Sequence, residues 1–283
     1  MTNYVLATKP LGCGSYGSVF KAKRRSDGTL FAVKKTKNES GIAYTTIREV
    51  AILKSIRHPR VLPLLDVFCT RDATCMVFPL CPGTLRGYME KNKMTVNVVR
   101  RLSTQLLDGL EFLHMKGVVH RDLNPSNLLM TPDDDLLIAD FGLCKISTPW
   151  TVQTTQMVTL WYRAPEVLLG SDNYGTAADM WSFGCILAEL MNGCPLFVGE
   201  DTKDQLAKIL EKLLWQPAAA ETAKKFLNVK NFVGATDEAL RSVLRGDDQA
   251  VALVLECLTF DEDTRATATE AQKSSFVGAM DID

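Results

Sequence analysis

A glycine-rich segment near the N-terminus has the pattern of a phosphate-binding loop. It reads Gly12-Cys-Gly14-Ser-Tyr-Gly17-Ser-Val19, which is a GxGxxGxV pattern. Glycines lack a Cβ, so they let backbone amides approach phosphate oxygens closely. In dinucleotide-binding folds such a loop opens a helix, whereas β-rich residues follow it here and predict a strand. Taken alone, the pattern also fits a plain flexible hairpin.

A lysine and a glutamate follow this loop at a spacing that suits phosphate binding. Lys34 ends the run Ala32-Val33-Lys34 on the expected third strand, and Glu49 lies on the helix expected after it. An ion pair between them would hold the ammonium against the α- and β-phosphates of a nucleotide. Either residue alone would be an ordinary solvated surface charge, so the inference depends on the motifs downstream.

Three further motifs place carboxylates and an amide in a fixed order. They are His120-Arg-Asp-Leu-Asn-Pro-Ser-Asn127 (HRDLxxxN), Asp140-Phe-Gly142 and Ala164-Pro-Glu166. Phosphoryl transfer needs a carboxylate near the attacking hydroxyl and oxygen ligands that hold Mg²⁺ on the phosphates. We therefore expect Asp122 to be the base, and Asn127 and Asp140 to bind the metal. A run of polar loop residues does not explain all of these motifs in this order.

Short β-rich runs and one helix must position the first motifs. Strands are predicted over residues 4–7, 18–23 and 30–35, with Asp27-Gly28 as the turn between the last two. Apolar residues recurring three and four apart predict a helix over residues 42–57, which must end before Pro59. Strands are expected again over residues 61–68 and 75–80.

The break at Cys81-Pro82-Gly83 divides the chain into predicted domains 1–81 and 82–283. Beyond it the pattern is helical: an apolar stripe runs from Val98 to Leu113, and residues 177–191 are apolar nearly all round. Residues 218–225 are compatible with an exposed helix or a mobile connection. The fold class predicted from these elements is α+β.

Composition narrows the functional classes. A chain of 283 residues with 46% apolar residues can bury a substantial core, which excludes a disordered protein. A net charge of -1 gives no bulk attraction to nucleic acid or to a membrane surface. The eight cysteines form no CxxC pair, which argues against zinc and fits a reducing compartment. With no signal pattern or membrane span, we expect an intracellular protein of the cytoplasm, the nucleus or both.

The motifs, in this order from Tyr4 to about Phe276, resemble those of eukaryotic protein kinases, and more narrowly those of the cyclin-dependent kinase group (CMGC type). The resemblance implies a small antiparallel β lobe with one helix, a hinge at residues 79–81 and a larger helical lobe. It also implies an activation loop over residues 140–166, and an ATP- and Mg²⁺-dependent protein Ser/Thr kinase active in cell-cycle or transcription-type control.

The same resemblance assigns the nucleotide site. Phe78 is the gatekeeper beside the adenine pocket, and backbone groups of Pro79 and Cys81 would bond adenine. The full set implied for ATP is Leu11, Gly12, Gly14, Gly17, Val19, Ala32, Lys34, Glu49, Phe78, Pro79, Cys81 and Leu129. The catalytic set implied is Asp122, Lys34, Asn124 and Thr159.

Three stretches favour the cyclin-dependent group. Residues 43–49 keep four of the seven residues of the group's cyclin-contacting helix motif. The sequence of residues 158–166 is similar to that of the group at the corresponding place. Residues 179–184 and 195–199 fall where the group has its buried central helix and the following loop. The resemblance thus implies a cyclin-like activating subunit, and makes Asp179 a brace for the catalytic loop. A capping-box partnership of Asp179 with Thr176 is the alternative.

Regulation and substrate choice follow from the resemblance as hypotheses. Thr154 falls at the activating phosphorylation site, with Thr155 as a neighbouring alternative, unless both are plain solvated threonines. The cations that would gather around that phosphate are Arg48, Arg121 and Lys145, and the inhibitory phosphosites would be Ser15 and Tyr16. Val158 and Arg163 would shape a pocket for proline, which implies Ser-Pro and Thr-Pro substrates.

The match departs from the family at several places. Asn124 replaces a lysine, which removes a cation aimed at developing charge, at a cost of ~10²- to 10³-fold in rate if nothing compensates. Ala43, Tyr44 and Thr46 change the expected cyclin surface, and residues 199–246 are shorter than in relatives. Arg265 is placed to pair with the glutamate of Ala164-Pro-Glu166.

Two alternatives stay open. A mitogen-activated type kinase would need no cyclin, but residues 140–166 hold no Thr-x-Tyr pair. A pseudokinase scaffold would keep the fold without the chemistry, and Asn124 is its only support. The intact residues that argue against it are Lys34, Glu49, Asp122, Asn127 and Asp140.

Overall fold

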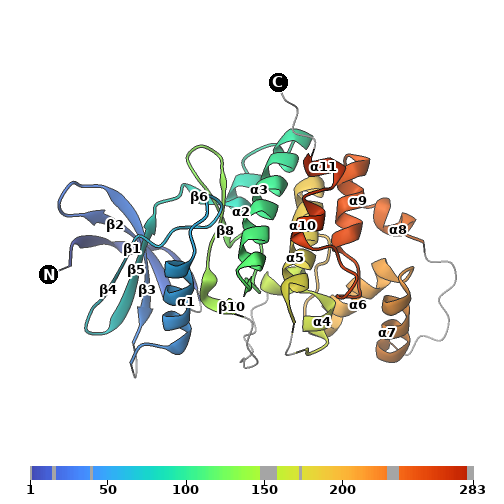
Figure 1. Ribbon diagram of the computed structural model, residues 1–283, viewed down its shortest axis with the longest axis horizontal. Coiled ribbons are helices and arrows are strands. Elements are labelled where there is room, and N and C mark those ends of the chain that lie inside the picture. The colour runs from blue at the N-terminus through green and yellow to red at the C-terminus, as the bar shows by residue number, and fades with distance from the viewer. Residues whose placement is uncertain are drawn as a thin grey trace.

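The computed structural model describes residues 2–14, 17–38, 41–146, 158–171, 174–227 and 236–278. They form two lobes that lie side by side (Figure 1). We define the N-terminal lobe as strands β1–β5 with helix α1, and the C-terminal lobe as the elements from β6 onward. The predicted boundary after residue 81 falls between β5 and β6, and the predicted α+β class is confirmed.

The N-terminal lobe is built on a five-stranded antiparallel sheet with the order β1-β2-β3-β5-β4. Its strands are β1 (Tyr4–Gly14), β2 (Gly17–Arg24), β3 (Leu30–Lys37), β4 (Asp66–Cys69) and β5 (Ala73–Pro79). The predicted turn joins β2 to β3, where Gly28 adopts a φ of 76°, a left-handed conformation that glycine favours.

Helix α1 (Tyr44–Ser55) lies between β3 and β4 and packs Ile52 and Leu53 into the core. The prediction of 42–57 was therefore too long by two residues at each end. Ile56 is already extended, with a φ of -118° and a ψ of 143°. Residues next to Pro59 favour extended backbone, so the helix stops before it reaches them.

The strand predicted over residues 61–68 was wrong in its first half. Only Asp66–Cys69 joins the sheet, while Val61 makes an isolated parallel bridge with Ile138 of the C-terminal lobe. Pro63 has no N–H to donate to a sheet ladder, which accounts for the interruption. The segment instead connects the lobes: Leu62 N–H donates to Ile138 O, and Leu65 N–H to Val77 O.

The C-terminal lobe is mainly helical, with short strands beside the site. The longer helices are α3 (Val96–Met115), α5 (Thr176–Asn192), α6 (Thr202–Leu213), α7 (Pro217–Leu227) and α9 (Asp248–Cys257). The short helices are α2 (Leu85–Met89), α4 (Pro165–Leu168), α8 (Glu238–Arg241), α10 (Ala268–Ala271), α11 (Ser275–Gly278), and the 3₁₀ turns η1 (Phe141–Leu143) and η2 (Val158–Tyr162). The strands are β6 (Gly83–Thr84), β7 (Val118–Val119), β8 (Leu128–Met130), β9 (Leu136–Ile138) and β10 (Lys145–Ile146).

Helix α5 is the centre of this lobe. Every residue from 178 to 190 is buried, which confirms the prediction of a helix apolar nearly all round, and the helix packs against α3 and α9 (Figure 1). Residues 218–225, left open by the sequence, form part of α7, whose Ala219 and Ala223 are buried. That segment is therefore a packed helix.

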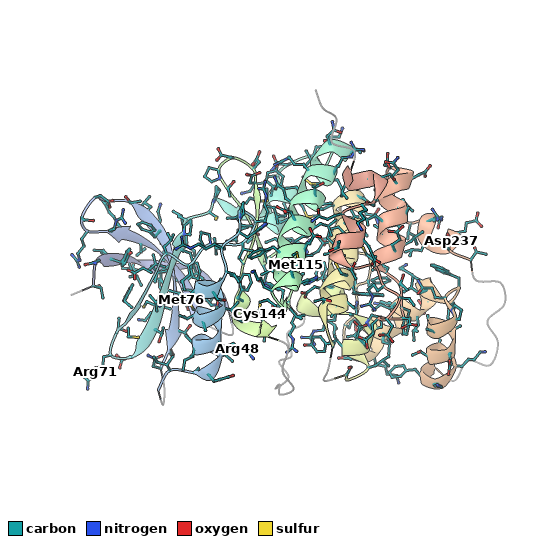
Figure 2. The ribbon with its side chains drawn as sticks, viewed as in Figure 1. Arg48, Arg71, Met76, Met115, Cys144 and Asp237 are labelled. Atoms are coloured by element: carbon teal, nitrogen blue, oxygen red, sulfur yellow. The ribbon has the colours of Figure 1, made fainter. Side chains whose placement is uncertain are left out.

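Side chains fill both lobes, with Met76 of β5 fully buried (Figure 2). All eight cysteines are free, and Cys75, Cys144, Cys185 and Cys257 are buried as small apolar side chains. Across the described part of the chain, no helix is both long and apolar enough to span a bilayer.

Candidate active site

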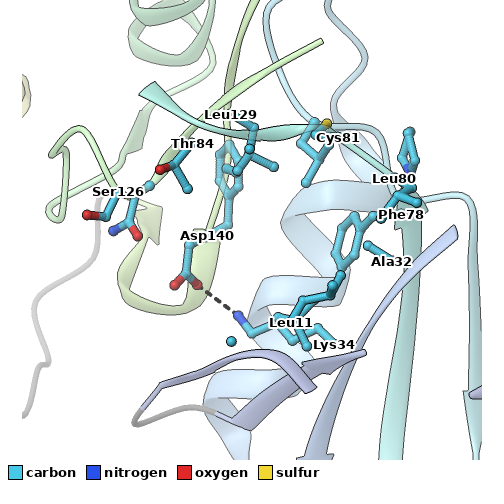
Figure 3. A pocket seen from close by; sticks show the side chains of 18 of the residues that line it. Leu11, Ala32, Lys34, Phe78, Leu80, Cys81, Thr84, Ser126, Leu129 and Asp140 are labelled. Carbon is cyan, nitrogen blue, oxygen red and sulfur yellow. Dashed lines mark hydrogen bonds and ion pairs between the residues drawn. The ribbon is translucent and has the colours of Figure 1, made fainter. Parts of the chain in front are cut away.

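A cavity of about 710 Å³ lies where the two lobes meet, and Figure 3 shows many of its side chains. It brings together predicted residues from distant parts of the sequence. Those that line it are Leu11, Gly12, Gly17, Val19, Ala32, Lys34, Glu49, Phe78, Pro79, Cys81, Asp122, Asn124, Asn127, Leu129 and Asp140. Gly14, the last residue of β1, pairs with Gly17 across the β1–β2 turn.

The glycine-rich loop joins two strands, β1 and β2, as predicted. Gly17 has a φ of 134°, and a Cβ there would fall 2.4 Å from the carbonyl oxygen of Lys35 on β3. That glycine therefore permits the close approach of β2 to β3. A Cβ on Gly12 would meet nothing within 4 Å, so its backbone faces open space over the cavity.

Apolar side chains line the part of the cavity beside the hinge (Figure 3). Leu11, Val19 and Ala32 come from β1–β3, and Leu129 comes from β8 in the other lobe. An apolar slot of this kind, which residues 79–81 of the hinge also line, suits a planar aromatic ring. Sequence reasoning missed Leu53, Leu62 and Phe141 in the lining, because apolar residues of this kind read as ordinary core.

Lys34 lies between two carboxylates, one of which, Asp140, is seen beside it in Figure 3. Its Nζ is 2.7 Å from Oε1 of Glu49 on α1 and 2.8 Å from Oδ1 of Asp140, just before η1. Burial alone would lower the pKa of Lys34, but the two negative charges outweigh it and raise that pKa. The ammonium therefore stays charged, and the predicted pair of Lys34 and Glu49 is present.

Asp122 lies in the segment between β7 and β8, at the floor of the same cavity. Nδ2 of Asn127 donates to its Oδ2 at 2.9 Å and to its backbone oxygen at 2.8 Å. Burial, with a smaller contribution from nearby Asp140, raises the pKa of Asp122 to about 6. A carboxyl group with this pKa is mostly ionised at neutral pH and accepts a proton more readily than an ordinary aspartate.

Asp179, at the N-terminal end of α5, holds the backbone that precedes Asp122. Its fully buried carboxylate accepts the N–H groups of His120 and Arg121, each at 2.8 Å, and lies 3.0 Å from Nε2 of His114. Burial opposes its ionisation, but these partners outweigh burial and lower its pKa. The N-cap of α5 is Gly175, so the alternative of a capping box with Thr176 does not apply.

Two further ion pairs fasten the surroundings of the site. Arg265 forms a bidentate pair with Glu166 at 2.7 and 2.9 Å, as predicted. Arg86 of α2 pairs with the buried Glu189 of α5, and the Tyr162 hydroxyl donates to that same carboxylate at 2.6 Å. Sequence reasoning missed this second cluster, since its members are far apart in the chain and match no motif.

Two of the three predicted phosphate-binding cations lie close to one another. The guanidinium of Arg121 stacks on Tyr174 at 4.6 Å, and that of Arg48 lies 5.8 Å from the centre of the Tyr44 ring. Burial and, next, the charge of Arg48 lower the pKa of Arg121. Nε of each arginine is buried and has no hydrogen-bond partner among the described residues.

Several predicted residues fall outside the part that is described. Ser15, Tyr16 and Thr154 lie in the undescribed ranges, and so do the side chains of Lys145, Val158 and Thr159. Arg163 is described, and it lines a small cavity with Asp122, Tyr162 and Tyr174.

The donor set at the cavity suits a magnesium ion held partly by phosphate. Within the described ranges no cluster of three or more His, Cys, Asp or Glu residues forms a closed metal site. Mg²⁺ is usually bound by one or two protein oxygen ligands together with phosphates and water. The Asp140 side chain is 38% exposed and faces the cavity that Asn127 also lines. These two residues fit such a site.

Comparison with known proteins agrees with this geometry. The family model described as "Protein kinase domain" matches residues 6–277. Cyclin-dependent kinase 1 of Encephalitozoon cuniculi is 34% identical over 298 residues, which cover 100% of this chain and 99% of that protein. Cell division control protein 2 homolog 3 of Trypanosoma brucei brucei is 39% identical over 285 residues, covering 95% of this chain and 91% of that protein.

A second trypanosome protein, cell division control protein 2 homolog 1, is 43% identical over 209 residues, covering 72% of this chain and 69% of that protein. The family match spans almost the whole chain, and the cavity carries the Lys, Glu and Asp side chains that the motifs predict. The chain belongs to the protein kinase family, within the cyclin-dependent kinase group, and it is an ATP-binding Ser/Thr protein kinase of that type.

Proposed function

We propose that this kinase is activated by a cyclin-like subunit and phosphorylates Ser-Pro and Thr-Pro sites of intracellular proteins, in cell-cycle or transcription-type control. The observation that carries the chemical part is the convergence of Lys34, Asp122 and Asp140 on one cavity. Two relatives are named as cell division control protein homologues, which supports the cell-cycle assignment.

The roles follow from position and charge. Lys34 holds the α- and β-phosphates, and Glu49 keeps its ammonium in place. Asp122 orients the attacking hydroxyl and accepts its proton, for which its raised pKa is suited. Asn127 and Asp140 hold Mg²⁺, which neutralises the charge that develops on the transferred phosphoryl group.

The activating partner would bind helix α1. Tyr44 and Ile47 lie three residues apart, and so on one helical face, with side chains that are 75% and 52% exposed. Ile42, just before the helix, is exposed as well. Exposed apolar residues on the helix that carries Glu49 would allow a partner to set the position of that carboxylate.

The remaining assignments concern the residues that would bind a phosphorylated Thr154 and the proline of the substrate. Phosphorylation of Thr154 would bring a charge near -2, which Arg48, Arg121 and Lys145 would bind. The unpartnered buried Nε atoms of the two arginines support a site for an anion. Thr159 and the proline pocket of Val158 and Arg163 remain assignments by resemblance, as do the inhibitory sites Ser15 and Tyr16.

The test uses the protein with a purified cyclin and an activating kinase. Phosphate transfer from Mg-ATP is measured to a Ser-Pro peptide and to its Ser-Ala twin. We expect transfer to the Ser-Pro peptide alone, and at least ~10²-fold less of it without the cyclin. Equal use of both peptides would refute proline direction, and full activity without any cyclin would favour a mitogen-activated type of control. ATP binding with no transfer under any condition would favour a scaffold.

A further inference from the structure

Asn124, at the position where the resemblance to the kinase group implies lysine, is buried and uses both ends of its amide within its own segment. The residue is only 5% exposed. Oδ1 accepts the N–H of Ser126 at 3.0 Å, and Nδ2 donates to the backbone oxygen of Asp122 at 3.0 Å. Nδ2 also lies 3.5 Å from Oδ1 of Asp122. The amide therefore closes the turn from residue 122 to residue 126.

Asn127 contacts Asp122 from the other side. Its Nδ2 donates to Oδ2 of the carboxylate and to the same backbone oxygen that Asn124 contacts. The Asp122 carboxylate is thus bracketed, with Asn127 at Oδ2 and Asn124 at Oδ1. We propose that Asn124 is a positioning residue that fixes the orientation of Asp122, and that it makes no contribution to holding the γ-phosphate. This inference rests on the proposed function of Asp122.

The charges around the cavity agree with a role for Asn124 in orienting Asp122 and not in holding the γ-phosphate. Among the described lining residues, Lys34 is the only cation, against the carboxylates of Glu49, Asp122 and Asp140. Asn124 adds no charge, and its polar atoms are engaged with Asp122 and Ser126. ATP affinity should therefore not depend on the side chain at 124, whereas the transfer step should depend on it through the placement of Asp122.

The backbone of the segment has other supports, so shortening Asn124 should leave the protein folded. Asn127 N–H donates to the carbonyl of Asn124, and Arg86 N–H donates to the carbonyl of Pro125, both at 3.0 Å. Asp179 holds the residues before Asp122. Removing the amide leaves the Asp122 carboxylate held at Oδ2 alone, by Asn127, without releasing the backbone that carries it.

The experiment compares Asn124→Ala, Asn124→Ser and wild type in the cyclin complex. Serine can still accept the Ser126 N–H in a short turn, whereas alanine cannot. Asn92→Ala is the matched control, because exposed Asn92 also uses its Nδ2 within a turn, on the carbonyl of Tyr88, outside the site. The measurements are kcat, KM for peptide, and the dissociation constants of ATP and ADP from a displaced fluorescent nucleotide.

We expect Asn124→Ala to lower kcat by about 10- to 100-fold through misplacement of Asp122. The ratio of ATP to ADP affinity should stay within about twofold of wild type, since ground-state binding is untouched. Asn124→Ser should recover part of kcat, and Asn92→Ala should match wild type. An unchanged kcat in Asn124→Ala, or a loss of ATP over ADP preference, would overturn the proposal.

A second measurement does not need catalysis. It therefore distinguishes a failure of the proposed function from a failure of the positioning role of Asn124. The exchange rate of the Ser126 amide hydrogen, measured by NMR, reports the bond to Asn124. Faster exchange in Asn124→Ala with recovery in Asn124→Ser supports the positioning role, even if no peptide is phosphorylated. Exchange equal to wild type in Asn124→Ala would refute it.

Discussion

Helices α1 and α5 each deliver a carboxylate to the site, yet the protein holds them in opposite ways. Helix α5 is buried along thirteen consecutive residues, and its Asp179 accepts the backbone N–H groups of His120 and Arg121, just before Asp122. Helix α1 buries Glu49, Ile52 and Leu53 but leaves Tyr44 and Ile47 exposed. The backbone that carries Asp122 is therefore held by a helix inside the core, while Glu49 lies on a helix with one exposed face.

The ion pairs repeat this contrast. The pair of Arg265 and Glu166 is almost wholly buried within the C-terminal lobe, with side chains 0% and 9% exposed, and it fastens α4 to the segment between α9 and α10. Lys34 and Glu49 join β3 to α1 beside an open cavity, where Asp140 offers Lys34 a second partner. Breaking the first pair should affect folding, whereas breaking the second should affect catalysis.

The largest expected effect is on stability, from Arg265→Ala. It leaves Glu166 buried without its cation, and we expect the free energy of unfolding to fall by ~3–5 kcal/mol. Urea denaturation followed by circular dichroism measures it. The control is Arg241→Ala, which breaks an exposed pair with Asp237 and should cost less than ~1 kcal/mol. Equal losses of unfolding free energy in the two variants would show that the buried pair matters no more for folding than an exposed one.

Glu49→Gln should have the next largest effect, and on rate. Lys34 keeps Asp140 as a partner but loses its fixed position, so kcat should fall by ~10²-fold. The free energy of unfolding should change by no more than ~1 kcal/mol. Steady-state kinetics and urea denaturation of the same preparation test both parts. If Glu49→Gln lowered the free energy of unfolding as much as Arg265→Ala, the contacts of α1 would matter as much for folding as those of the C-terminal lobe, and the contrast would fail.

Acidification should protonate Asp122, the proposed base. The pKa of Asp122 is raised to about 6, so the base is protonated below that pH. We expect kcat/KM for peptide to fall tenfold per pH unit below about 6 and to level off above about 7. Because burial within the C-terminal lobe sets this pKa, the midpoint should be the same with and without the partner. A midpoint near 4 would contradict the burial of Asp122.

The same pKa has a consequence for stability. The folded-state pKa of Asp122 lies above the 3.8 of an ordinary aspartate, so the native protein binds more protons than the unfolded chain between about pH 4 and 6. The contribution of Asp122 to stability is therefore present below pH 4 and is lost as pH rises through 6. Asp122→Asn should be more stable than wild type at pH 7, with a gap that closes on acidification in urea denaturation.

The smallest stability effect is expected on the exposed face of α1. Tyr44→Ser should change the free energy of unfolding by less than ~0.5 kcal/mol, because the side chain is 75% exposed. The same change should weaken binding of an activating cyclin, measured by calorimetry. A large loss of stability with unchanged cyclin binding would show that Tyr44 serves the fold and not a partner.

Motifs in the sequence were enough to predict most of the cavity lining, because residues such as Lys34, Asp122 and Asp140 occur in short patterns with fixed order. Contacts between ordinary residues were not predictable. Arg86 and Glu189 are 103 residues apart, and either would pass for a surface charge until the fold brings them together. The early strand at residue 61 was mispredicted because β-rich composition outweighed the missing donor at Pro63.

Asn124 shows the same limit within a motif. The sequence revealed that a cation was absent, but only the structure shows where the amide is directed. Likewise, Gly17 fits a phosphate loop by pattern, yet the structure ties it to the packing of β2 against β3. Residue type could be read from the pattern, whereas the partner of each side chain depends on tertiary contacts.

The most direct test of the account is the single-turnover rate of phosphate transfer by wild type and by Asp122→Asn, with ATP affinity measured in parallel. We predict that wild type transfers phosphate to a serine hydroxyl and that the variant is slower by ~10²- to 10⁴-fold at unchanged ATP affinity. Transfer by Asp122→Asn at the wild-type rate would contradict the assignment of Asp122 as the base of this kinase.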